Sequence, residues 1–172
     1  MGASTLYYNM TDKNMFNATP ALFFDFENPQ MDPDVLEKEI TETIEKLNVI
    51  GLSANQIGHD VRCMALNSQD RGVVVMFNPQ LKAVSKETVV MREGDAMVPD
   101  FYVNLKRPKH IVLEYQDSVG DTHELDLSDV AARCVLHELD NLNGVLFFAR
   151  ASRLKLQRAI KSKLKREKRR YG

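Results

Sequence analysis

The chain has 172 residues, of which 44% are hydrophobic, and a formal net charge of -1. This length and composition fit one globular domain with a substantial core, and they exclude a fibrous or disordered chain. The near-neutral total hides a division: residues 150–172 hold eleven Lys or Arg and one acid, so they carry +10 and the remainder carries -11. We therefore expect a single domain over residues 1–172 with a basic tail at 150–172.

Cysteine usage and hydropathy indicate the compartment. Two cysteines, Cys63 and Cys134, are too few for a disulfide framework. No apolar run approaches the ~18–20 residues of a membrane span, and residues 1–30 include charged side chains but no long apolar segment of a signal peptide. These features predict a cytoplasmic protein that does not enter a membrane.

The first predicted element is a loop over residues 1–30, where no periodicity is evident. A helix should follow, because Asp32 suits the N-cap and Pro33 suits the first helical position. Apolar residues then recur at helical spacing, at Leu36, Ile40, Ile44 and Leu47. The helix is expected to end at about Leu47.

Short β-rich runs occupy the chain from residue 61 to residue 126. The predicted strands are 62–66, 73–77, 86–91, 111–115 and 122–125. A polar turn is expected at Asn78-Pro79, and Gly120-Asp121 predicts the turn of a hairpin between the last two strands.

A second helix is expected from a cap at Asp126 or Ser128 to a C-cap at Gly144. Spacings of four, three and four residues place four side chains on one of its faces: Val130, Cys134, His137 and Asn141. Residues 145–148 suit a strand or a core loop. A final helix from about Ser152 has a narrow apolar stripe of Leu156, Ile160 and Leu164, so the whole chain reads as an α+β domain with a basic helical tail.

Two segments put small or polar residues where a core element does not need them. Residues 51–58 are small and include Gln56, which suits either a tight loop or close approach to a ligand. Residues 92–99 contain Glu93-Gly94-Asp95, which suits either a solvated turn or a bulge that directs Asp95 into a cleft.

A third segment, residues 136–144, contains half of a zinc-hydrolase motif. In His-Glu-x-x-His proteins, two histidines one helical turn apart bind the metal and the glutamate moves the proton of bound water. Here His137 and Glu138 match, but Asn141 stands where the second histidine is expected. Considered alone, this pair is more typical of a histidine at the edge of a core.

Taken together, the three segments resemble the peptide deformylase family. Members carry Gly-x-Gly-Leu-Ala-Ala-x-Gln, then Glu-Gly-Cys-Leu-Ser-x-Pro, then Gln-His-Glu-x-Asp-His-Leu-x-Gly. This chain has Gly-Leu-Ser-Ala-Asn-Gln at 51–56, Glu-Gly-Asp-Ala-Met-Val-Pro at 93–99 and Leu-His-Glu-Leu-Asp-Asn-Leu-Asn-Gly at 136–144. The resemblance spans roughly residues 33 to 155.

The resemblance implies a fold and a reaction. The fold is α+β, with mixed or antiparallel sheets around a central helix that bears metal ligands. The reaction removes the N-formyl group from the initiator methionine of nascent polypeptides by means of metal-activated water. It also implies roles for individual residues: Glu138 as general base and then acid, Gln56 and the Ala96 backbone N–H as donors to the oxyanion, and Ile50, Gly51 and Leu52 as the peptide-binding segment.

The departures from the family pattern fall on the metal. The family's ligands are one Cys and two His, and the matching positions are Asp95, His137 and Asn141. A carboxylate and a neutral amide are weaker ligands for Zn²⁺ or Fe²⁺ than thiolate and imidazole. The expected cofactor is Fe²⁺, Zn²⁺ or Ni²⁺ if the protein is active, and no metal if it is not. Cys134 could supply a thiolate from one turn earlier, or it could be a small buried residue behind the site.

The basic tail allows two interpretations: a solvated helix docked on an acidic body, or a set of phosphate contacts. The resemblance favours the second, because deformylases act at the ribosomal exit tunnel and some dock there through a basic C-terminal helix. The expected partners are formylmethionyl nascent peptides and ribosomal RNA, bound by a monomer. Two functions remain open at this stage: a peptide deformylase, or an inactive homologue that binds ribosomes or nascent peptides.

Overall fold

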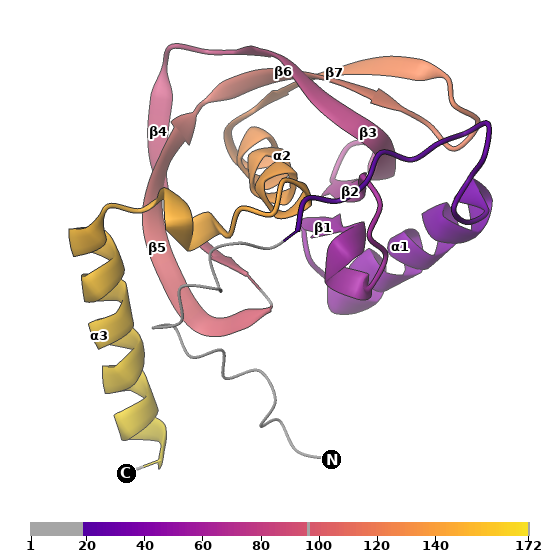
Figure 1. Cartoon of the computed structure of the whole chain (residues 1–172). Helices are drawn as coiled ribbons and strands as arrows, with labels where there is room; N and C mark the ends of the chain where they lie inside the picture. Colours follow the sequence, from indigo (N-terminus) through magenta and orange to yellow (C-terminus); the bar gives the residue numbers. More distant parts are fainter. Residues whose placement is uncertain (1–18, 96, 172) are drawn as a thin grey trace.

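The structure is a computed structural model that describes residues 19–95 and 97–171 (Figure 1). The helices are α1 (Pro33–Leu47), α2 (Asp129–Leu142), α3 (Arg153–Tyr171) and the 3₁₀ turns η2 (Ala54–Ile57) and η3 (Phe147–Arg150). The strands are β1 (Gly51–Ser53), β2 (Cys63–Ser68), β3 (Gly72–Val84), β4 (Thr88–Asp95), β5 (Val98–Pro108), β6 (His110–Gln116) and β7 (Thr122–Ser128). This arrangement confirms the predicted α+β class.

The strands form two antiparallel sheets. One has five strands in the order β1-β2-β3-β6-β7, and the other is the β4-β5 hairpin. Figure 1 shows α2 enclosed between the hairpin on one side and the larger sheet on the other. The central helix therefore faces both sheets, and its side chains are positioned from two directions.

The amphipathic pattern of α2 explains its central place. Its apolar residues pack with those of β2, β3, β6 and β7 in one core cluster, which includes Met64, Met76, Leu113, Val135 and Leu139. Of the eleven residues from Ala132 to Leu142, all but Cys134 are buried, among them His137 and Asn141. Burial of so many polar groups requires partners from the surrounding strands.

The first helix forms as its sequence predicts. The Asp32 side chain accepts a hydrogen bond from the Asp34 N–H, and Pro33 occupies the first turn. Leu36, Ile40 and Ile44 are fully buried against the other side of β2 and β3, whereas Leu47 is half exposed and extends past the core. Asn48 then ends the helix in the left-handed region at φ 51°.

Two strand predictions were wrong. The expected turn at Asn78-Pro79 is instead a register shift within β3, where Asn78 has φ 48° and its side chain bonds the backbone of Phe24. Strand β5 was not predicted, although its residues alternate between buried and exposed. The hairpin at Gly120-Asp121 is confirmed, and Ser128 is the N-cap residue of α2, although its side chain makes no capping hydrogen bond. The predicted C-cap at Gly144 was wrong, because the cap is Asn143.

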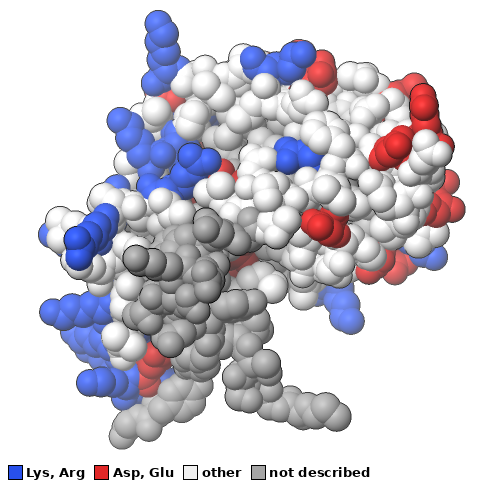
Figure 2. All heavy atoms as spheres, in the orientation of Figure 1, with Lys and Arg blue, Asp and Glu red and all other residues white. Residues whose placement is uncertain are grey.

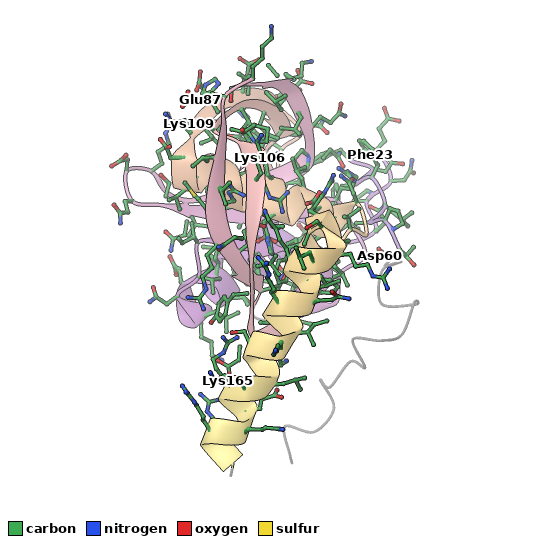
Figure 3. The ribbon with its side chains drawn as sticks, turned by 90° about the vertical axis from the view of Figure 1, so that its left-hand side faces the viewer. Phe23, Asp60, Glu87, Lys106, Lys109 and Lys165 are labelled. Atoms are coloured by element: carbon green, nitrogen blue, oxygen red, sulfur yellow. The ribbon has the colours of Figure 1, made fainter. Side chains whose placement is uncertain are left out.

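The basic helix α3 makes its apolar contacts with β5 through its first half, and Arg166 and Arg170 of its second half bond Asp100 of the same strand. Leu156, Ala159 and Ile160 join the core cluster of Phe101, Phe147 and Phe148, but Leu164 is 54% exposed, so the predicted stripe is buried only in part. Figure 3 shows the second half, with Lys165, extending beyond the other helices and strands. In Figure 2, Lys and Arg gather over α3, and Asp and Glu gather toward the side of α1. No helix among the described residues is long and apolar enough to cross a membrane.

Candidate active site

A cavity of about 390 Å³ lies between α2, β1 and the end of β4. Its lining includes most of the residues that the sequence singled out: Ile50, Gly51, Leu52, Gln56, Asp95, His137 and Glu138. Asn141 joins the same site through hydrogen bonds, and Ala96 lies outside the described residues. Three segments separated by about forty residues each therefore meet at one place, as the motifs predicted.

Asp95 is the polar centre of this site. Its side chain is 5% exposed, and a register shift between Gly94 and Asp95 turns it toward α2, which confirms the bulge rather than the solvated turn. Its carboxylate accepts hydrogen bonds from His137 Nε2 at 3.1 Å, Gln56 Nε2 at 3.2 Å and the Met97 N–H at 2.8 Å. Burial opposes ionisation of Asp95, but the bonds from His137 and Met97 outweigh it, so its pKa lies below the ordinary value.

His137 lies between two carboxylates. Its Nδ1 is 3.3 Å from Glu93 Oε2, and its Nε2 is 3.1 Å from Asp95 Oδ2. Burial alone lowers the pKa of an imidazole, but the bonds to Asp95 and Glu93 outweigh burial and raise the pKa of His137 to about 10. The ring also packs 5.4 Å from the Phe147 ring, which fixes its plane.

Glu138 is buried beside Gly51 of β1. It accepts a hydrogen bond from Asn141 Nδ2 at 3.2 Å. Burial, reinforced by the charge of Asp95, raises its pKa, so a proton is held there more tightly than on an ordinary glutamate. A Cβ at Gly51 would lie 2.9 Å from Glu138 Oε1, so the absence of a side chain at Gly51 is what allows β1 to approach this carboxyl group.

Gln56 is held in one orientation. Its Oε1 accepts bonds from the Ser53 N–H and the Ser53 hydroxyl, both at 2.9 Å. Its Nε2 is therefore left to face Asp95 and the cavity. This arrangement supplies an amide donor at the site, in keeping with the donor role expected from the sequence.

Behind the site lies a buried ion network that the sequence analysis did not identify. Glu93 accepts bonds from Arg107 at 2.7 and 2.8 Å and from Arg133 at 2.6 Å. Arg107 also donates to Asp140 at 2.6 Å, and Arg150 donates to the other Asp140 oxygen at 2.6 Å. Burial opposes ionisation of Glu93, yet these bonds lower its pKa to about 2.

A signal for this network was present in the sequence. Arg107 stands in phase with Phe101, Val103 and Leu105, all of which face inward from β5. A charged residue at an inward position of an alternating strand requires a buried partner. Arg133 is likewise one turn before His137 on the buried side of α2.

Cys134 lines the cavity but is not positioned as a ligand by any bond to Asp95 or His137. Burial, reinforced by the charges of Glu138 and Glu93, raises the pKa of its thiol to about 11. The protonated thiol is a poor metal ligand. These observations favour the interpretation of Cys134 as a small residue packed behind the site.

The residues present do not fit the divalent metal that the resemblance implies. Among the described ranges, no three His, Cys, Asp or Glu side chains converge on a point that could hold a metal ion. Asp95 and His137 are the two side chains that could bind a metal strongly, and they are already hydrogen-bonded to each other. Asn141 offers an amide, which is shorter than imidazole and directs its N–H group to Asp95 and Glu138.

Comparisons with known proteins agree on a family. The family model for polypeptide deformylase matches residues 21–157. A peptide deformylase of Bartonella quintana is 32% identical over 137 residues, which cover 77% of this chain and 78% of the relative. That of Rhizobium meliloti is 34% identical over 137 residues, covering 76% of this chain and 79% of the relative.

Solved structures give the same result for the fold. Arabidopsis thaliana peptide deformylase 1B, in complex with an inhibitor, matches with a TM-score of 0.76 at 28% identity and covers 92% of this chain and 88% of that chain. A Synechococcus elongatus peptide deformylase in complex with actinonin has a TM-score of 0.74 at 25% identity, covering 87% and 81% of the two chains.

Proposed function

The chain belongs to the peptide deformylase family, and we propose that it binds the N-formylmethionyl end of nascent polypeptides in the cavity between β1 and α2 and hydrolyses the formyl amide. The family match over residues 21–157 carries this proposal. The cavity of about 390 Å³ supports it, because Ile50 and Leu52 give it apolar walls that suit a methionine side chain.

In the proposed reaction, Glu138 takes a proton from the attacking water and then delivers it to the leaving amine. The raised pKa of Glu138 suits both halves of this task, since the group must first accept a proton and then release it. The Gln56 amide donates to the oxygen of the formyl group as negative charge develops on it. Ala96, expected to help through its backbone N–H, lies outside the described residues.

The family is metal-dependent, and a bound metal supplies a Lewis acid that polarises the formyl carbonyl and the water. Asp95, His137 and Asn141 do not fit such a metal, so the reaction proposed for this chain relies on Glu138 and Gln56. Removal of a single hydrogen-bond donor to the oxyanion already lowers kcat by about 10²–10³ in other enzymes. We therefore propose that deformylation by this chain is slow compared with relatives that have the Cys and two His ligands.

The alternative to this proposal is an inactive homologue that binds formyl-methionyl peptides. An assay of formate release from formyl-Met-Ala-Ser, with binding of the same peptide measured by calorimetry, separates the two. Release that Glu138→Gln abolishes, and that the exposed control Glu45→Gln preserves, supports the slow enzyme. Binding of the formylated peptide without any release supports the inactive homologue, and equal binding of the unformylated peptide contradicts both.

We further propose that α3 binds ribosomal RNA near the exit tunnel, in the cytoplasm where nascent chains emerge. This proposal is supported by a set of exposed, positively charged side chains along the helix: Arg153, Arg158, Lys161, Lys165, Lys168 and Arg169. Such clusters bind phosphates by releasing counterions, so their affinity falls with salt.

Charge reversal tests this better than truncation, because Ala159 and Ile160 belong to a core cluster. The variant Lys161→Glu/Lys165→Glu should weaken ribosome co-sedimentation and reduce the salt dependence of binding by about two phosphate contacts. A control, Lys46→Glu/Lys86→Glu, makes the same change in net charge at exposed lysines elsewhere. Equal weakening by both variants would contradict a specific role for α3.

A further inference from the structure

We propose that a self-contained hydrogen-bonded cluster of Asp95, His137, Asn141 and Gln56 has replaced the metal centre in this chain, and that the protein folds and holds its site without a metal. This inference stands apart from the proposed function, because metal content and stability are measured without a substrate. It begins from what each side chain already bonds.

The carboxylate of Asp95, a candidate metal ligand, is already hydrogen-bonded by its neighbours. The Asp95 carboxylate accepts from His137, Gln56, the Met97 N–H and, at 3.4 Å, Asn141 Nδ2. Its oxygens are thus satisfied by hydrogen donors that come from η2, α2 and its own turn. A buried carboxylate with this many donors has no unmet requirement for a cation.

The imidazole of His137 has both nitrogens directed at carboxylates. Glu93 Oε2 lies 3.3 Å from Nδ1, and Asp95 Oδ2 lies 3.1 Å from Nε2. In metal sites the second nitrogen of a ligating histidine bonds a carboxylate or carbonyl, while the first points its lone pair at the metal. Here a carboxylate stands at both ends of the ring, and Asp95 occupies the side on which the metal would lie.

Asn141 closes the cluster. Its Nδ2 donates to Asp95 Oδ2 and, at 3.2 Å, to Glu138 Oε2, and so links the two carboxyl groups across the site. Its backbone carbonyl accepts from Asn55 Nδ2 at 2.8 Å, which holds η2 against α2. The amide therefore performs a cross-linking role that a metal and its ligands perform in other hydrolases.

The residues around the site still form the arrangement that supports a metal-binding histidine, in which a carboxylate bonds the second ring nitrogen. Glu93 is fixed by Arg107 and Arg133, and it still bonds His137 Nδ1. Two side chains, at positions 95 and 141, therefore separate this site from the Cys-His-His set. Restoring both should produce a metal site on an otherwise unchanged framework.

The test compares the purified wild type with the variant Asp95→Cys/Asn141→His. A control variant, Asp95→Ser/Asn141→Gln, changes the same two positions without supplying a thiolate or an imidazole. Metal content is measured by mass spectrometry after expression with added Zn²⁺, and Tm is measured with and without a chelator. We expect less than a tenth of an equivalent of metal in the wild type and in the control, with no effect of chelator on Tm. The restored variant should hold about one equivalent and lose several degrees of Tm when chelated.

Two results would overturn the proposal. The first is stoichiometric metal in the wild type that a chelator removes with a fall in Tm. The second is a folded Cys/His variant that binds no more metal than its Ser/Gln control. If the restored variant does not fold, the wild-type measurements decide the question alone.

Discussion

Replacement of Glu93 by glutamine should destabilise the protein far more than the loss of an ordinary surface ion pair. The Glu93 side chain is 4% exposed and accepts bonds from Arg107 at 2.7 and 2.8 Å, Arg133 at 2.6 Å and His137 at 3.3 Å. The amide in Glu93→Gln offers one acceptor and no charge, so buried Arg133 loses the carboxylate with which it pairs and buried Arg107 loses one of its two carboxylates. Breaking a buried ion pair by removing one partner costs about 3–5 kcal/mol.

The assay is urea unfolding followed by circular dichroism, with a matched control. Glu87→Gln makes the same chemical change in an exposed glutamate that pairs with Lys109 at 3.0 Å, and Figure 3 shows both residues at the surface. The control should leave the free energy of unfolding nearly unchanged. In thermal unfolding, the same loss of free energy should lower the Tm of Glu93→Gln by about 10–15 °C. A loss for Glu93→Gln no larger than that for Glu87→Gln would refute the reasoning.

Other changes give further expectations. Gly51→Ala should cost about 1–3 kcal/mol of stability and weaken binding of a formylated peptide, because its Cβ would meet Glu138 Oε1 at 2.9 Å; unchanged calorimetric binding would contradict this. The folded pKa of Glu93, about 2, is below its ordinary 4.5, so its contribution to stability is complete above pH 4.5 and is lost as pH falls toward 2. Urea unfolding of wild type and Glu93→Gln should therefore converge over that interval, and a constant difference would count against the ion network. The raised pKa of Glu138 predicts that formate release increases with pH through a midpoint above 4.5, and a profile that is flat from pH 4 to 8 would exclude Glu138 as the base.

Local sequence signals predicted the helices well. The cap at Asp32, the proline at the first turn and the spacing of Leu36, Ile40 and Ile44 all act within a few residues, so they determine α1 without tertiary context. The same holds for α2, where periodicity placed His137 and Asn141 on one face. Motif spacing then located most of the cavity lining.

The strand errors have a different origin. Asn78-Pro79 has the composition of a turn, but pairing with β2 and β6 keeps the chain in β3, and the bulge accommodates the proline. Val98-Pro99-Asp100 similarly conceals the start of β5, because Pro and Asp are uncommon in strands. In both cases pairing with a partner strand decides the conformation: Gln80, next to Pro79, pairs with Glu114 of β6, and Val98 pairs with Asp95 of β4.

The ion network was missed for a related reason. Glu93, Arg107, Arg133 and Asp140 are charged residues, which are most often exposed, and their partners lie 14 to 40 residues away. Burial of each one depends on the placement of α2 against β4 and β5. Alternation along β5 was the one local indication that Arg107 faces inward.

The far end of α3 is joined to the rim of the cavity region. Arg166 donates to the Asp100 carbonyl at 2.6 Å, and Arg170 pairs with the Asp100 carboxylate at 2.9 Å. Asp100 lies five residues after Asp95, and both line a second, shallower hollow of about 600 Å³. The last turns of α3 are thus tied to the start of β5, which begins at Val98, three residues after Asp95. Movement of the end of this helix away from the strand requires both arginine bonds to Asp100 to break.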